Sequence, residues 1–265
     1  MPTLPEPHRH RDTAESFGTN AARYDRTRPS YPDAMVAAIV AAGPGPGVLD
    51  VLDVGCGTGI SSRQFVAAGC RMLGVDADPR MAEFARGTGL DVEVARFEDW
   101  EAAGRTFDLV VAGQTWHWVD PVAGAAKAAT VLRPAGRLAV FWNVAQPPEE
   151  VAEAFAEVYR RVLPDSPFGT VSAQPLDAYA PGFTTAAHGM RACGAFGEPA
   201  HWRYEWERLC TRDEWLDVVP THGGHNLLPP AQLTELVDGF GAAIDAAGGS
   251  FPMSYTTVVV TAALN

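Results

Sequence analysis

The feature that most constrains the fold is a glycine-rich turn between an apolar strand and a helix. Residues 48–54 read VLDVLDV, and Gly55, Gly57 and Gly59 follow at alternate positions before the helical pattern ISSRQFVAAG begins. Glycine permits a tight turn and lets a ligand approach the main-chain N–H groups without a Cβ in the way. The pattern therefore predicts a cofactor site at the carboxyl end of a sheet strand.

Short apolar runs then alternate with helical stretches. The runs read RMLGVDAD, DVEVARF, FDLVVAG and RLAVFWNV, and two further strands, RYEWERLC and YTTVVVTAAL, follow near the end of the chain. Continuous apolar runs are typical of strands that are buried on both faces, and regular alternation with helices indicates parallel pairing through crossovers. We predict an α/β fold with a doubly wound, mostly parallel sheet.

The organisation along the chain predicts one domain with additions. Residues 1–15 are polar and rich in proline, and we expect a flexible tail there. A single domain follows over residues 16–265, and its expected parts are an N-terminal helical cap (16–47), a cofactor-binding core (48–145), an inserted lid (146–200) and a segment that completes the sheet (201–265).

Composition excludes several classes of function. A formal net charge of −12, with scattered Lys and Arg, disfavours a nucleic acid partner. The four cysteines show no CxxC spacing, so no metal site or disulfide framework is expected. No long apolar run or secretion signal is visible, which predicts no membrane association and a cytoplasmic location.

An acidic residue follows the glycine turn at an informative distance. Asp76 ends the next apolar strand, 21 residues after Gly55, where a carboxylate can accept hydrogen bonds from both hydroxyls of a ribose. The third glycine falls at Gly59, whereas a dinucleotide-binding turn would place it where Ile60 stands. A phosphate-binding P-loop lacks its GK[ST] sequence here.

With these motifs the chain resembles the class I S-adenosylmethionine (SAM)-dependent methyltransferases, in the small-molecule branch similar to trans-aconitate and ubiquinone-type methyltransferases. The resemblance covers residues 17–145 well and the rest in outline. It implies a Rossmann-like sheet of seven strands, SAM as the cofactor, methylation of a small organic molecule, and S-adenosylhomocysteine as the product.

The resemblance also assigns the cofactor site. It implies contacts from the glycine loop and from the next two strand ends: Asp53, Gly55, Cys56, Gly57, Gly59, Asp76, Ala77, Met81, Phe97 and Glu98. The loop would hold the methionine part, Asp76 the ribose, and the later residues the adenine. Arg96 departs from the pattern, because relatives often carry an acid at that place.

The segment after FDLVVAG resembles the QAxHW motif of these enzymes. Gln114 is expected to hydrogen-bond the methionine portion of SAM, and Trp116 and Trp118 to contact the substrate. His117 is the candidate catalytic residue, either orienting the substrate or acting as a general base. Alternatively, the histidine and tryptophans only pack the end of the sheet.

Two further motifs complete the expected site. Residues 24–32 resemble a YDxxRPxYP segment that caps the SAM pocket, in which Arg28 would pair with the cofactor carboxylate and Tyr24 would lie over the sulfonium. The prolines of this segment alternatively serve only to separate two helices. His222 and His225 are expected on a loop beside the substrate, since no nearby acid or cysteine completes a metal site.

Two alternative functions stay open at this point. One is an NAD(P)-dependent oxidoreductase on the same fold, which the glycine spacing disfavours. The other is a SAM-binding regulatory protein without catalysis. The methyl acceptor, the atom that is methylated, and a homodimeric state are not determined by the sequence.

Overall fold

The computed structural model describes residues 17–265 except 165, 167–168 and 170–174. One sheet of seven strands has the order β3-β2-β1-β4-β5-β7-β6. Only β7 is antiparallel to its neighbours, and the predicted α/β fold is confirmed. The strands are β1 (Asp50–Val54), β2 (Arg71–Asp76), β3 (Val92–Val94), β4 (Phe107–Gly113), β5 (Leu132–Gln146), β6 (Ala200–Thr211) and β7 (Ser250–Ala263).

Helices cover both faces of the parallel strands. Alternate residues of β1 face opposite layers, because successive side chains in a strand point to opposite sides. Val51 packs with the helices α3 (Asp33–Ala41) and α4 (Ile60–Ala67), whereas Leu52 packs in the core that holds α6 (Pro121–Val131) and α8 (Pro175–Ala192). Both side chains are fully buried, which explains the continuous apolar runs.

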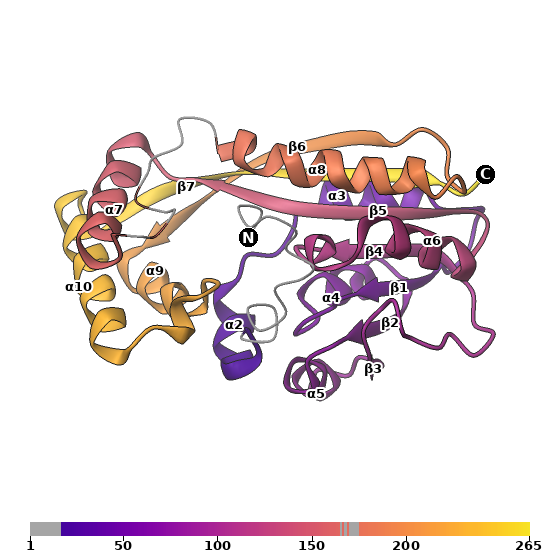
Figure 1. Ribbon diagram of the computed structural model, residues 1–265, viewed down its shortest axis with the longest axis horizontal. Helices are drawn as coiled ribbons and strands as arrows, with labels where there is room; N and C mark the ends of the chain where they lie inside the picture. The colour runs from indigo at the N-terminus through magenta and orange to yellow at the C-terminus, as the bar shows by residue number, and fades with distance from the viewer. Residues whose placement is uncertain (1–16, 165, 167–168, 170–174) are drawn as a thin grey trace.

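The last three strands extend well beyond the parallel ones. β5, β6 and β7 contain 15, 12 and 14 residues, against 5 in β1. At their far end lies a second core, which Phe155, Phe240 and Phe251 build with further apolar side chains. Its helices are α7 (Glu149–Val162), α9 (Arg212–Val218) and α10 (Pro230–Ala246), seen together at one end of the molecule in Figure 1.

The segment expected as an inserted lid therefore contains two helices with different packing. α7 joins the second core through Phe155, whereas α8 lies on the sheet beside α6 (Figure 1). The approach between α8 and α6 is close, because a Cβ at Gly189 would lie 2.1 Å from the carbonyl oxygen of Pro121. The expected tail, residues 1–15, lies outside the described residues.

The N-terminal elements connect the parallel part of the sheet to the helices of the second core. A 3-10 turn, η2 (Phe17–Asn20), leads into α2 (Ala21–Thr27), followed by an irregular loop before α3. Arg23 and Arg26 both form ion pairs with Asp217 of α9, with N–O distances of 3.0 and 2.8 Å. A further helix, α5 (Pro79–Gly87), packs along β2 and β3. None of the helices in the described ranges is long and apolar enough to cross a membrane.

Candidate active site

A cavity of about 730 Å³ opens at the carboxyl ends of the parallel strands. Its volume falls in the range of small-molecule sites. It brings together most of the residues that the sequence predicts: Tyr24, Arg28, Gly55, Cys56, Gly57, Asp76, Ala77, Met81, Phe97, Glu98, Gln114, His117, Trp118 and His222. Four predicted residues lie outside its lining: Asp53, Gly59, Trp116 and His225.

The glycine loop lies against this cavity, and its glycines differ in role. Gly55, Gly57 and Gly59 have φ angles of +62°, +56° and +85°, a region that favours glycine. A Cβ at Gly57 would meet no atom within 4 Å, so the backbone there borders open space that a ligand can enter. A Cβ at Gly59 would lie 2.3 Å from Leu90, and this glycine serves the packing of the turn.

Asp76 ends β2 and faces the cavity. Its carboxylate accepts the N–H of Gly57 at 2.7 Å and the N–H of Asp78 at 2.8 Å, which ties the acid to the glycine loop. Burial raises the pKa of Asp76 to about 6, although these two hydrogen bonds act in the opposite direction. Each carboxylate oxygen has further lone pairs for a ligand hydroxyl.

Asp53 lies behind the glycine loop. Its Oδ2 accepts hydrogen bonds from the hydroxyls of Ser61 and Ser62 at 2.8 and 2.6 Å, at the start of α4. Burial raises its pKa to about 6. The expected direct contact with the cofactor is therefore not supported by its position, and the acid anchors the helix that follows the loop.

The residues expected around the adenine line one side of the cavity. Ala77, Met81, Phe97 and Glu98 all contribute to the lining, as does Arg96, the residue that departs from the family pattern. Glu98 accepts the backbone N–H of Asp120 at 3.1 Å, which connects it to the start of α6. Met81 and Phe97 are buried, so this side of the cavity is apolar where they line it.

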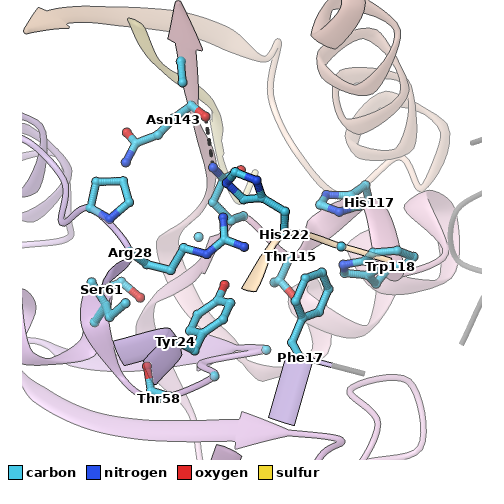
Figure 2. Close-up of a pocket in the computed structure, with 18 of the residues that line it drawn as sticks. Phe17, Tyr24, Arg28, Thr58, Ser61, Thr115, His117, Trp118, Asn143 and His222 are labelled. Atoms are coloured by element: carbon cyan, nitrogen blue, oxygen red, sulfur yellow. Dashed lines mark hydrogen bonds between the residues drawn. The ribbon is translucent and has the colours of Figure 1, made fainter. Parts of the chain in front are cut away.

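The segment after β4 is held in a constrained backbone. Gln114 has a φ of +55°, which is uncommon for a residue with a side chain and costs free energy that surrounding contacts must offset. Its N–H donates to the carbonyl of Phe141 at 2.8 Å. Its Nε2 donates to the carbonyl of Asn143 at 3.0 Å, and Figure 2 draws a dashed line at the labelled Asn143. These bonds fix the direction in which the following residues leave the sheet.

Trp116 and Trp118 point to different sides. Both belong to the 3-10 turn η3 (Trp116–Trp118), where residues two apart are separated by about 240° around the axis. Trp118 reaches the cavity, and Trp116 is 2% exposed within the core, with its ring 6.3 Å from that of Phe97. Trp116, predicted to contact the substrate, therefore does not line the cavity, because the turn directs this side chain inward.

His117 reaches the cavity from the middle of the same turn. The indole N–H of Trp142 donates to its Nδ1 at 3.3 Å. A neutral imidazole that accepts at Nδ1 carries its proton on Nε2. Burial holds the pKa of His117 well below its usual range, so the ring is neutral at pH 7 and offers a hydrogen-bond donor at Nε2.

Tyr24 and Arg28 close the cavity from the N-terminal cap. The guanidinium of Arg28 lies 4.9 Å above the centre of the Tyr24 ring and donates to the carbonyl of Thr221. Two buried polar atoms of cavity-lining residues, Nε of Arg28 and Oγ1 of Thr58, have no hydrogen-bond partner within the described part of the chain. Such groups carry a desolvation cost that a polar ligand would remove.

The two C-terminal histidines have different surroundings. His225 is buried, with Nδ1 2.8 Å from the carbonyl of Val219 and Nε2 3.2 Å from the hydroxyl of Tyr159. His222 lines the cavity instead. His225, also predicted to contact the substrate, does not line the cavity, and both of its ring nitrogens are engaged by neighbouring protein groups. In the described ranges no cluster of three or more metal-ligating side chains occurs.

Sequence reasoning missed Asn143, which lines the cavity from β5. Its Nδ2 donates to the carbonyl of Ser30 at 3.1 Å, and its Oδ1 accepts the hydroxyl of Thr257 at 2.6 Å. Asn143 thereby connects the β5 and β7 strands to the loop that follows Arg28. The available signal was one amide within the apolar run RLAVFWNV, where a buried polar residue requires an explanation.

A mostly parallel sheet of seven strands, with a glycine loop and an acid at the adjacent strand end, is what the resemblance to the class I SAM-dependent methyltransferases predicts. Residues 52–140 match the family model described as Methyltransferase domain. A methyltransferase domain of this class implies SAM as the methyl donor.

Relatives share the same part of the chain. An uncharacterized methyltransferase of Mycobacterium tuberculosis is 37% identical over 136 residues, which cover 50% of this chain and 54% of that protein. A ubiquinone biosynthesis O-methyltransferase of Cereibacter sphaeroides is 34% identical over 125 residues, which cover 44% of this chain and 50% of that protein. The chain thus spans about half the length of the curated relatives it matches.

A solved structure extends the likeness to most of the fold. A type II methyltransferase structure from Anaeromyxobacter dehalogenans aligns with a TM-score of 0.61 and 22% identity, covering 88% of this chain and 97% of that chain. At this identity the match shows a shared fold and no shared substrate.

Proposed function

We propose that this protein transfers the methyl group of SAM to a small organic molecule and releases S-adenosylhomocysteine. The observation that carries the proposal is the open space at Gly57 beside the carboxylate of Asp76, in the same cavity as the Nε of Arg28, which has no hydrogen-bond partner among the described residues. The matched methyltransferase domain and the name of the Cereibacter sphaeroides relative support the same reaction class.

The residues present fit the charges and hydroxyls of SAM. The Asp76 carboxylate can accept from the ribose hydroxyls, and Arg28 can pair with the cofactor carboxylate. The Tyr24 ring, which already lies beneath one cation, can face the sulfonium. Bound SAM supplies an electrophilic methyl group. The protein's contribution is to align the acceptor with that group and to exclude water.

His117 orients the acceptor rather than removing its proton. Its Nδ1 accepts the indole N–H of Trp142, so the neutral ring carries its proton on Nε2. A donor at this place can hold an oxygen of the acceptor. The arrangement favours the orienting role over the general base role, both of which the sequence left open.

Calorimetric titration with SAM tests the proposal. We expect binding of SAM and S-adenosylhomocysteine by the wild type, loss of both in Asp76→Ala and Gly57→Val, and unchanged binding in Asp238→Ala, an exposed acid on α10. Tight NAD(H) binding without SAM binding would identify an oxidoreductase instead. SAM binding with no turnover on any acceptor would favour the regulatory alternative.

A further inference from the structure

The cavity continues beyond the glycine loop into an aromatic lobe at the junction of α7, α9 and the extended strands. We define this lobe by Phe155, Tyr159, Trp215, Met253 and Tyr255, which all line the cavity. The rings of Phe155 and Trp215 are stacked, with centroids 5.3 Å apart and an interplanar angle of 12°. A surface of this kind favours a planar, mostly apolar molecule.

His222 lies where this lobe meets the rest of the cavity. The preceding carbonyl, of Thr221, accepts a hydrogen bond from Arg28, so the loop of His222 is tied to the N-terminal cap. The ring of His222 meets the edge of Trp215 at 5.5 Å between centroids. Figure 2 shows Arg28, His117 and His222 around the same cavity.

The cavity-lining histidines differ in what holds their rings. His117 accepts an N–H from Trp142, whereas no hydrogen bond to a ring nitrogen of His222 occurs within the described part of the chain. A neutral imidazole always has one nitrogen with a lone pair that can accept a proton. Of the two, His222 is the ring in which that nitrogen is not already used by a neighbour.

We propose that His222 accepts the proton of the methyl acceptor, and that the acceptor is a phenol whose ring lies in the aromatic lobe. This inference rests on the proposed function and names the substrate class of the same site. His117 then acts as a positioning residue that donates to the acceptor from the other side.

Among methyl acceptors that must lose a proton, the weak basicity of His222 favours a phenol. Burial, Arg28 and His225 together hold the pKa of His222 well below its usual range. Further titratable groups that line the cavity beside the lobe are Tyr159, Arg208, Cys210, Glu214 and Tyr255. The ring is therefore neutral at pH 7 but weakly basic. A weak base can assist loss of a phenol proton, whose pKa is about 10, far better than loss of an aliphatic hydroxyl proton.

The lobe also offers a donor for a second oxygen. The indole N–H of Trp215 is buried without a hydrogen-bond partner in the described ranges. An acceptor with a second oxygen on its ring would satisfy this group, and we therefore choose catechol as a probe beside simple phenols.

The atoms and charges of the proposed step balance. The phenol oxygen forms a bond to the methyl carbon while the bond from that carbon to sulfur breaks, and its electron pair goes to sulfur. The proton of the hydroxyl moves to the ring of His222. One positive charge leaves the sulfonium and one appears on the imidazolium, which then releases its proton to water. No oxidant, reductant or metal takes part in this balance.

Turnover on a defined probe panel tests the acceptor class. Protein and SAM are incubated with catechol, 1-naphthol, cyclohexanol, aniline or benzoate, and S-adenosylhomocysteine is measured. In parallel, protein loaded with S-adenosylhomocysteine is titrated with each probe. We expect turnover or binding of the phenols alone. Preference for aniline or benzoate, or neither turnover nor binding of any phenol, would show that the acceptor is not a phenol.

Variants at three histidines test the role of His222. With a phenol that turns over, His222→Gln should lower kcat by about 100-fold or more with an unchanged KM for SAM. Its kcat should rise with pH as the phenol ionises in solution, whereas the wild type stays level. His117→Gln should mainly raise the KM of the phenol, and His188→Gln, on an exposed part of α8, should behave as wild type.

The outcomes separate this inference from the proposed function. Normal kcat in His222→Gln, or a kcat that is independent of pH in that variant, would show that His222 takes no proton. Failure of the wild type to bind SAM would instead overturn the proposed function itself.

Discussion

Binding of SAM should depend on pH through Asp76. The pKa of this acid is about 6, because burial disfavours its charged form. Only the ionised carboxylate can accept both ribose hydroxyls while it also accepts the N–H groups of Gly57 and Asp78. Affinity should therefore approach its maximum only well above pH 6, fall to about half of that at pH 6, and be lost as the pH falls further.

The magnitude follows from the ionised fraction. With a pKa of about 6, about nine tenths of the protein carries an ionised Asp76 at pH 7, and about one tenth at pH 5. We expect the association constant for SAM to fall about tenfold between these pH values, which corresponds to about 1.4 kcal/mol. Titration calorimetry at both pH values, at constant ionic strength, measures this ratio.

The matched variants are Asp76→Asn and Asp53→Asn. The first should bind weakly at pH 7 and show no decline at pH 5, since it has no proton to gain. The second should keep the decline, because Asp53 lies behind the loop, outside the cavity lining. An equal affinity of the wild type at pH 7 and pH 5, or an undiminished slope in Asp76→Asn, would refute the reasoning.

Three further predictions concern the loop and its supports. Gly57→Ala should abolish SAM binding but lower the unfolding free energy by only about 1–2 kcal/mol, because its Cβ meets open space. Gly55→Ala should lower the unfolding free energy by more, since its Cβ would lie 2.2 Å from Thr115, and urea unfolding of both variants measures the difference. The raised pKa of Asp53 should cost the wild type about 3 kcal/mol of stability as the pH rises from about 4 to 6, and urea unfolding of Asp53→Asn should lack this part of the pH dependence while the part due to Asp76 remains. Asp217→Asn should change the unfolding free energy by less than about 1 kcal/mol, because its ion pairs with Arg23 and Arg26 are partly exposed. Loss of these pairs frees α2 from α9, so SAM should dissociate several-fold faster in stopped-flow measurements. An unchanged rate of SAM release would contradict a bridging role for α2.

Local chemistry made part of the site predictable. A positive φ requires glycine, and an acid at the end of the next strand lies beside the glycine loop in any doubly wound sheet. The positions of Gly57 and Asp76 at the cavity thus follow from spacing alone. The same holds for the strands, since burial on both faces leaves a continuous apolar run that can be read without a structure.

Other residues could not be assigned from spacing. Trp116 and His117 are neighbours, yet the turn sends one into the core and the other into the cavity. His222 and His225 share one motif, yet Val219 and Tyr159 engage only His225. These differences depend on the direction of each side chain, which short turns change by a third of a circle per residue.

The sequence by itself determined the sheet, the glycine loop and the acid that faces it, because strand periodicity and backbone conformation are local properties. Only the tertiary structure decided which cavity-lining histidine has a ring nitrogen that can still accept a proton. It also decided that α7 packs in the second core whereas α8 packs on the sheet. Arg28, Trp142 and Thr221 meet His117 and His222 through contacts between segments far apart in the chain. Such contacts depend on packing across the whole fold, and no local pattern encodes them.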